Sequence, residues 1–300
     1  MGLDRGRQVR VHAGAGQSGR RPEPAADGPA RRRLRRLVTS SWEVLHGSVQ
    51  GPRKQLCQDR MKFRRRDGDV LVLAVADGHG ARAHRYSHIG ARLAVDAFLE
   101  VVDQAPEITA RWARRELGAL VVHRWNELVA QHHHREPPLR QPDLELYGTT
   151  LIGGVLAPHA TLACQIGDGD LCVVIDGEVH MPLRAETAAF GDETDSLCSA
   201  NARHLARIWW EPHRRPGLVT LSTDGLSNSF ADPAGFGAFV SGLRDRLAER
   251  GADPVQQDLP GWLDRAASYS GDDTTLLAAW RAAPQDDEEW TPHPMTAKET

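Results

Sequence analysis

The sequence of 300 residues contains no run of eighteen consecutive apolar residues, which is about the length that a membrane-spanning helix needs. Its N-terminal region also has no continuous apolar core of the kind found in a secretory signal. We therefore predict a cytoplasmic protein with no membrane partner.

Cysteine is also scarce in this sequence. Cys57, Cys164, Cys172 and Cys198 form no C-x-x-C pair, and a chain of this length does not need disulfides to hold its core. We expect reduced thiols, and the spacing does not predict a zinc site. The net charge of −3 gives no reason to expect nucleic acid as a partner of the whole protein.

The charges are unevenly distributed along the chain. Residues 1–38 combine many arginines with glycine and proline, and residues 283–300 begin with an acidic run. Both segments have too few large apolar side chains to order themselves, so we predict a disordered arm and a disordered acidic tail. A basic arm can contact nucleic acid, anionic lipid or an acidic partner, but we assign this one no function. The remaining residues, 39–282, are predicted to form the globular domain.

Apolar patterning within this domain alternates between strand and helix periods. Residues 187–202 are predicted to form a surface loop, and His132, His133 and His134 a solvated loop. The order of the elements predicts an α+β domain with a mostly antiparallel sheet. The predicted strands are 42–48, 60–63, 70–76, 148–155, 161–166, 171–175, 177–181, 204–210, 218–222 and 274–280, and the predicted helices are 88–102, 108–129, 233–247 and 254–269.

The apolar run in VLVLAVADGHG ends abruptly at Asp77. A carboxylate at a strand end, followed by Gly78 and Gly80 that let the backbone approach a ligand, is a common way of holding a hard cation. His79 is then positioned as a nearby acid or base. The alternative is an ordinary Asp-Gly turn beside a solvated histidine.

Aspartates mark several other predicted strand boundaries. If these carboxylates gather at one edge of the sheets, cations are needed between them to offset their repulsion. Oxygen ligands without a Cys or His pair favour Mg²⁺ or Mn²⁺, and two such ions are typical of phosphoryl hydrolysis. Unrelated turns remain the alternative. The junctions are Asp59, Asp77-Gly78, Asp168-Gly169, Asp224-Gly225 and Asp272-Asp273.

The motifs occur in a recognisable order: QD at 58–59, VADGHG at 75–80, GTT at 148–150, GDGD at 167–170, STDGL at 222–226 and GDDTT at 271–275. This set resembles the metal-dependent protein phosphatase family, the type 2C serine/threonine phosphatases. The resemblance implies two packed antiparallel β-sheets flanked by pairs of α-helices, with residues 39–282 as the catalytic domain. It also implies hydrolysis of phosphoserine and phosphothreonine by a metal-activated water, without a covalent intermediate.

Roles are carried over by position in the motifs. Asp77 resembles the ligand that bridges two Mn²⁺ or Mg²⁺ ions, and His79 resembles the general acid. Lys54 or Arg53 resembles the cation that meets the substrate phosphate. The remaining implied ligands are the Gly78 carbonyl, Asp224 and Asp272 on one ion, Asp59 through water, and Asp168 on a third, looser ion.

The sequence departs from the family pattern at several positions. Cys57 and Gln58 replace the usual Asn-Glu, and Gln58 removes one charge from the outer shell of the metals. Asp273 replaces an asparagine and is expected either to bind metal or to hydrogen-bond locally. The segment 187–202 takes the place of the family's flap, which influences substrate choice.

The expected partners are a phosphorylated protein substrate and a cognate serine/threonine kinase in the same pathway, with a monomer as the default state. One alternative is a catalytically weak regulatory module that binds a phosphorylated partner, which the departures at Cys57 and Gln58 favour. The other is a two-metal hydrolase of phosphodiesters or nucleotides, with the arginine-rich arm contacting nucleic acid.

Overall fold

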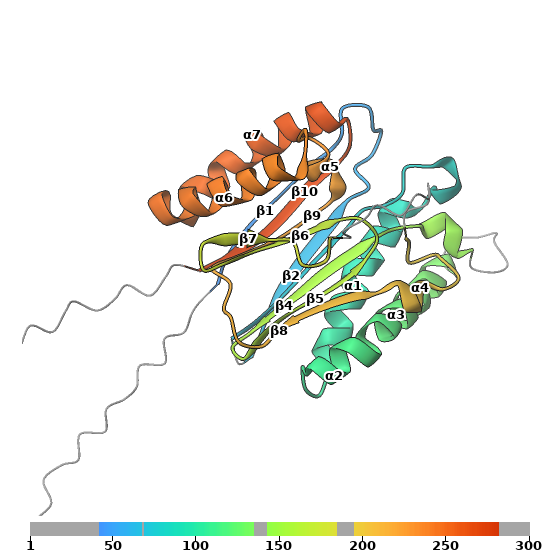
Figure 1. Ribbon diagram of the computed structural model, residues 1–300. Helices are drawn as coiled ribbons and strands as arrows, with labels where there is room; N and C mark the ends of the chain where they lie inside the picture. The colour runs from blue at the N-terminus through green and yellow to red at the C-terminus, as the bar shows by residue number, and fades with distance from the viewer. Residues whose placement is uncertain (1–41, 68, 135–142, 185–194, 282–300) are drawn as a thin grey trace, which may run out of the picture. The chain divides into compact units, whose positions relative to one another are not determined.

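The computed structural model describes residues 42–67, 69–134, 143–184 and 195–281 (Figure 1). The predicted arm and tail lie outside the described residues. Two five-stranded sheets form the domain, and every pair of neighbouring strands is antiparallel. The first sheet has the order β1 (Glu43–Val49), β10 (Thr274–Trp280), β9 (Leu218–Ser222), β6 (Asp170–Ile175), β7 (Glu178–His180), and the second has the order β2 (Arg60–Arg66), β3 (Val70–Ala76), β4 (Leu151–Ala157), β5 (Ala160–Ile166), β8 (Arg207–Glu211).

Helices cover the outer face of each sheet (Figure 1). On the second sheet lie α1 (Ser87–Gln104) and a long helix made of α2 (Ala110–Trp112), a π-helical segment (Ala113–Leu117) and α3 (Gly118–His133). On the first sheet lie α6 (Pro233–Arg250) and α7 (Ala252–Ser270). The predicted α+β fold of two packed antiparallel sheets flanked by helices is confirmed. Short helices at loops are Arg82–His84, Leu144–Tyr147, α4 (Ala202–Leu205) and α5 (Asp224–Ser227).

The period of two in β3 explains why it is buried on both faces. Leu71, Leu73 and Val75 belong to the core between the sheets, where they join apolar residues of β9 and β10. The alternating residues, such as Val72 and Ala74, belong to the core beneath α1 and α3. A third apolar cluster fills the space beneath α6 and α7. The strand that carries Asp77 is thus fixed from both sides.

Several local predictions were wrong at their boundaries. The predicted strand 204–210 begins only at Arg207, because α4 precedes it. The triple histidine is not a solvated loop, since His132 and His133 belong to the last turn of α3 and His133 is buried. The predicted surface loop 187–202 is described only from residue 195, and there Ser196 and Leu197 are buried.

Among the described helices, none has the combination of length and apolar character that a membrane span requires.

Candidate active site

A cleft of about 800 Å³ opens at the ends of the strands and collects most of the predicted site residues. Four of its acidic residues, separated by up to nearly two hundred positions in the chain, come from the predicted Asp junctions. The predicted residues that line it are Lys54, Asp77, His79, Asp168, Asp224 and Asp272. Its polar wall also includes His84, Glu145 and Asp195.

The backbone of Asp77 is held by the GTT motif. The Thr149 hydroxyl and the Thr150 amide both donate to the Asp77 carbonyl, at 2.7 Å and 2.8 Å. In return the Asp77 amide donates to Thr150 Oγ1 at 3.1 Å. The predicted strand that includes these threonines begins only at Leu151, because the two residues hydrogen-bond to Asp77 instead of extending the strand.

Gly78 is required by a close approach of two segments. A Cβ at this position would lie 2.8 Å from the backbone of Ser87, at the start of α1, and 3.0 Å from the carbonyl oxygen of Gln58. No larger residue fits without moving α1. The glycine therefore lets the Asp77 strand end, the Gln58 loop and α1 meet at one point.

Asp59 lies behind the cleft and is 2% exposed. Its Oδ2 accepts a hydrogen bond of 2.8 Å from the hydroxyl of Thr223, the residue just before Asp224. Burial raises the pKa of Asp59 to about 7, against the hydrogen bonds from Thr223 and Thr275, which lower it. A carboxyl group in this position retains a proton unless a cation offsets its burial.

Burial also disfavours the charged forms of Asp77 and Asp224. Burial raises the pKa of Asp77 well above its usual value, and the charges of Asp59, Asp224 and Asp272 raise it further. Burial likewise raises the pKa of Asp224 to about 6, helped by the charge of Asp168. Burial and the surrounding carboxylates therefore let Asp77 and Asp224 keep protons to a higher pH than exposed aspartates do.

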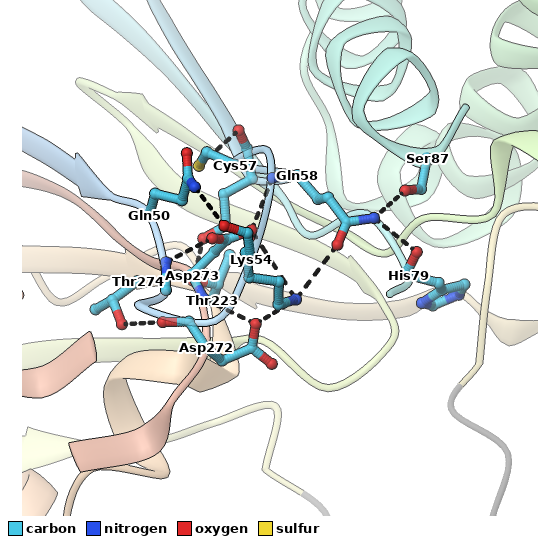
Figure 2. Close-up of polar contacts among 12 residues, drawn as sticks. Gln50, Lys54, Cys57, Gln58, His79, Ser87, Thr223, Asp272, Asp273 and Thr274 are labelled. Atoms are coloured by element: carbon cyan, nitrogen blue, oxygen red, sulfur yellow. Dashed lines mark hydrogen bonds and ion pairs between the residues drawn. The ribbon is translucent and has the colours of Figure 1, made fainter. Parts of the chain in front are cut away.

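Asp272 is neutralised by a lysine instead (Figure 2). The Lys54 ammonium lies 2.5 Å from Asp272 Oδ1 and donates to Gln58 Oε1 at 3.3 Å. The amide nitrogen of Gln58 donates onward to the His79 carbonyl at 3.0 Å and to the Ser87 hydroxyl at 2.6 Å. Gln58 therefore links the lysine to the end of β3 and the start of α1.

The neighbouring Asp273 has a local role. It is buried, and its two oxygens accept the backbone N–H groups of Gly51 and Gln58 at 2.8 Å and 2.7 Å. Of the two alternatives for Asp273, the structure shows local hydrogen bonding. It holds the loop that carries Lys54.

The two candidate phosphate-binding cations point in different directions. Lys54 lines the cleft, whereas Arg53 is not among the lining residues. The guanidinium of Arg53 lies against Gly271, where a Cβ would come within 2.6 Å of Nη2 and where the backbone has a positive φ of 78°. Arg53 thus packs on the turn before β10.

His79 faces the cleft beside a second histidine. The ring centroids of His79 and His84 are 5.0 Å apart. Burial lowers the pKa of His79, the nearby His84 lowers it further, and Asp168 opposes both by raising it. Apart from Asp168, this environment disfavours the protonated form that a proton donor needs.

The chemistry of the carboxylates fits a hard divalent cation. Asp59 Oδ1 and Asp224 Oδ1 are buried and receive no hydrogen bond from any N–H or O–H of the described residues. Within the described part of the chain, however, no three acidic, histidine or cysteine side chains converge as a formed metal site. The Lys54 ammonium occupies one side of Asp272. A cation that binds to Asp272 must displace it, and one that binds the buried carboxylates must displace any proton they hold.

Part of the cleft wall comes from the segment 187–202, which the resemblance assigns to the flap. Ser196, Cys198 and Asn201 line the cleft from its described residues. The Ser196 hydroxyl donates to the Thr149 carbonyl at 3.1 Å and accepts the Thr149 amide at 3.2 Å. The sequence does not show which residues of this segment face the cleft, because that depends on the distant Thr149.

Comparisons with known proteins extend over most of the chain. The family model for protein phosphatase 2C matches residues 47–264. The chain is also similar to serine/threonine-protein phosphatase 3 of Escherichia coli strain K12, with 25% identity over 260 residues that cover 80% of this chain and 99% of that protein.

Solved structures share the fold. The serine/threonine phosphatase of S. agalactiae has a TM-score of 0.58 and 18% identity, covering 80% of this chain and 99% of that one. The catalytic domain of the serine/threonine protein phosphatase PstP, in complex with 2 manganese ions, has a TM-score of 0.56 and 20% identity, covering 81% and 99%. Because the family model matches well over half of the sequence, the chain belongs to the protein phosphatase 2C family, and the predicted enzyme class, a protein serine/threonine phosphatase, is confirmed.

Proposed function

We propose that this chain hydrolyses phosphoserine and phosphothreonine in proteins with the help of Mn²⁺ or Mg²⁺. One observation carries the proposal: Asp77, Asp168, Asp224 and Asp272 line a single cleft, with Asp59 buried directly behind them. Such a concentration of carboxylates is costly without cations. The manganese ions in the PstP catalytic domain, which has the same fold, support the choice of a divalent metal.

The proposed ligands follow the motif positions. Asp77 would be shared by two ions, the Gly78 carbonyl would be a further ligand, Asp224 and Asp272 would hold one of the ions, and Asp59 would act through water. Asp168 would hold a third ion. When bound, these ions supply a nucleophilic water at neutral pH and offset the charge of the phosphoryl group.

Lys54 is the proposed contact for the substrate phosphate. Burial lowers the pKa of Lys54, but the hydrogen bond to Asp272 and the charges of Asp272, Asp273 and Asp77 raise it above the usual value. The side chain therefore stays an ammonium at neutral pH. It faces the cleft, whereas Arg53 packs on Gly271, and these positions favour Lys54 over Arg53. A phosphate competes with Asp272 for this ammonium.

His79 is the proposed donor of a proton to the departing seryl or threonyl oxygen. It lines the same cleft as Asp77 and Lys54, and its backbone is fixed by an N–H bond of 3.1 Å to the Gly148 carbonyl. Burial and then His84 lower the pKa of His79 below its usual value, and the charge of Asp168 opposes them. A group with a pKa near the working pH is suited to this transfer.

The experiment compares hydrolysis of a phosphothreonine peptide with Mn²⁺, with Mg²⁺ and with excess EDTA. We expect turnover with the metal, none in EDTA, and recovery when Mn²⁺ is restored. Full turnover in EDTA refutes the proposal. Tight peptide binding without turnover would instead favour the regulatory module, and faster hydrolysis of a bis-ester substrate would favour the phosphodiesterase alternative. A cognate kinase, a monomeric state and a cytoplasmic location stay predictions.

A further inference from the structure

An apolar groove in the helix layer of the first sheet has no part in the proposed chemistry. It has a volume of about 330 Å³ and lies where α6 faces α7, beside the end of α5. Its wall is aromatic, with ring centroids 5.5 Å apart for Phe230 and Phe239, and 6.5 Å apart for Phe239 and Trp262. Tyr269, which also lines it, is 82% exposed. An open aromatic wall of this kind is suited to a large apolar anchor.

The charges of the groove all have one sign. Arg246 and Arg265 line it, and none of the described lining residues is acidic. The Arg246 guanidinium lies 5.4 Å above the centroid of the Trp262 ring. Neither arginine forms an ion pair with another residue of the described ranges. The groove is therefore complementary to a segment that combines an aromatic side chain with adjacent carboxylates.

The chain itself contains such a segment. Residues 286–290 read Asp-Asp-Glu-Glu-Trp, so four carboxylates stand directly before an aromatic anchor. We propose that this segment docks in the groove, with Trp290 against the aromatic wall and the carboxylates facing Arg246 and Arg265.

The segment is close enough to reach. Gln256 of α7 donates to the His46 carbonyl at 3.0 Å, and His46 pairs with Leu277 of β10. The helix near Gln256 thus lies over the second half of β10, and Trp262 is six residues further, roughly 9 Å along the helix. Trp290 is nine positions after Arg281, which directly follows β10, and an extended chain of nine residues spans roughly 30 Å.

A segment docked in the groove would contact residues that directly follow one of the cleft carboxylates in the chain. Leu226 and Phe230, which line the groove, follow Asp224 directly in and after α5. An occupied groove therefore packs against the segment that positions one of the cleft carboxylates. The docking itself is measured without activity, so its failure would leave the proposed function untouched.

The first experiment places the photoreactive residue p-benzoylphenylalanine at position 290 of the full chain. After irradiation of a dilute sample, mass spectrometry should map crosslinks within one chain to lining residues of α6 and α7. The R246E/R265E variant should lower their yield about fivefold, as expected for the loss of a few exposed charge contacts. A matched variant, R111E/R114E, reverses two exposed arginines of the helix layer on the second sheet, which form no ion pair within the described residues, and should leave the yield unchanged.

A second variant shows whether a lower yield in R246E/R265E comes from lost charge contacts or from misfolding. D286N/D287N/E288Q/E289Q changes only residues outside the described fold and should lower the crosslink yield to the same extent. Crosslinks spread over the whole surface would overturn the proposal. A crosslink yield that neither set of charge changes lowers would overturn it as well. Crosslinks found only between two chains overturn it too, since the occupant would then be a second copy.

Discussion

The carboxylates of the cleft are neutralised in two different ways. In the inner half, burial raises the pKa of Asp59, Asp77 and Asp224, so these groups keep protons to a higher pH, and Asp59 also accepts from Thr223. In the outer half, Asp272, whose side chain is 41% exposed, pairs with the Lys54 ammonium. The inner half depends on burial and protons, and the outer half depends on the positive charge of a side chain.

This difference predicts two separate costs of binding a cation. Ligation of the inner carboxylates releases protons, so it becomes easier as the pH rises. Ligation of Asp272 displaces Lys54, which is then available to the substrate phosphate. Substitutions in the inner half should therefore change how cation binding depends on pH. Substitutions in the outer half should change the competition between the cation and Lys54.

The largest effect is expected for Asp77→Asn, which removes the carboxylate between Asp59 and Asp224. We expect kcat/KM for a phosphothreonine peptide to fall by about 10³-fold, the scale of losing a preorganised electrostatic group. In EDTA the same variant should be more stable to urea than the parent, because burial makes the parent take up a proton at Asp77 on folding, or bury its charge, and asparagine needs neither. The exposed Asp264→Asn serves as control. Parental activity in Asp77→Asn would mean that the inner half is not the reaction centre.

Lys54→Met tests the outer half. We expect kcat/KM to fall roughly 10- to 100-fold, mainly through KM, because a charge-assisted contact to phosphate is lost. Calorimetry should show tighter Mn²⁺ binding than in the parent, since no ammonium competes for Asp272. Arg53→Met is the matched control and should change little, as Arg53 packs on Gly271. If the Mn²⁺ affinity of Lys54→Met equals that of the parent, the ion pair is no barrier to the metal.

The two halves also differ in how far the sequence predicts them. The end of β3 at Asp77 is a local signal, because an apolar run stops at Asp-Gly, and the other Asp junctions repeat it. The grouping of these carboxylates follows from the motif order. That part of the site is predictable because short motifs of neighbouring residues determine it.

The neutralising partners are not predictable in the same way. Thr149 reaches Asp77 across more than seventy positions, and Asp273 holds Gly51 and Gln58 across more than two hundred. Whether Lys54 or Arg53 faces the cleft depends on side-chain direction, which spacing does not give. His133 was mistaken for a loop residue for the same reason: its neighbours in sequence are polar, and only tertiary packing buries it.

The pH dependence of stability sharpens the comparison in the absence of metal. The pKa values of Asp59 and Asp224 are raised from 3.8 to about 7 and about 6, so the folded state keeps protons that the unfolded chain has released. Stability should therefore be greatest near pH 4 and fall as the pH rises to about 7. Urea midpoints measured in EDTA at several pH values between 4 and 8 give this slope, because that range covers the titration of both groups.

Mn²⁺ should flatten or reverse that slope, because it binds the deprotonated carboxylates. Asp59→Asn should weaken the slope in EDTA, whereas Lys54→Met should leave it in place. A slope that is the same in EDTA and in Mn²⁺ would mean that the cation does not bind at the carboxylates whose pKa values are raised.

The smallest effect is expected for Thr149→Val, which removes one of the two hydrogen bonds to the Asp77 carbonyl. The Thr150 amide still donates to that oxygen, so we expect a loss of about 1 kcal/mol in the free energy of unfolding and a fall of a few-fold in kcat/KM. Thr149→Ser keeps the hydroxyl and should retain both. If kcat/KM falls while the urea midpoint does not move, the hydroxyl acts by aligning Asp77. If only the midpoint moves, the inner half tolerates a loosened strand end, and burial alone positions its carboxylates.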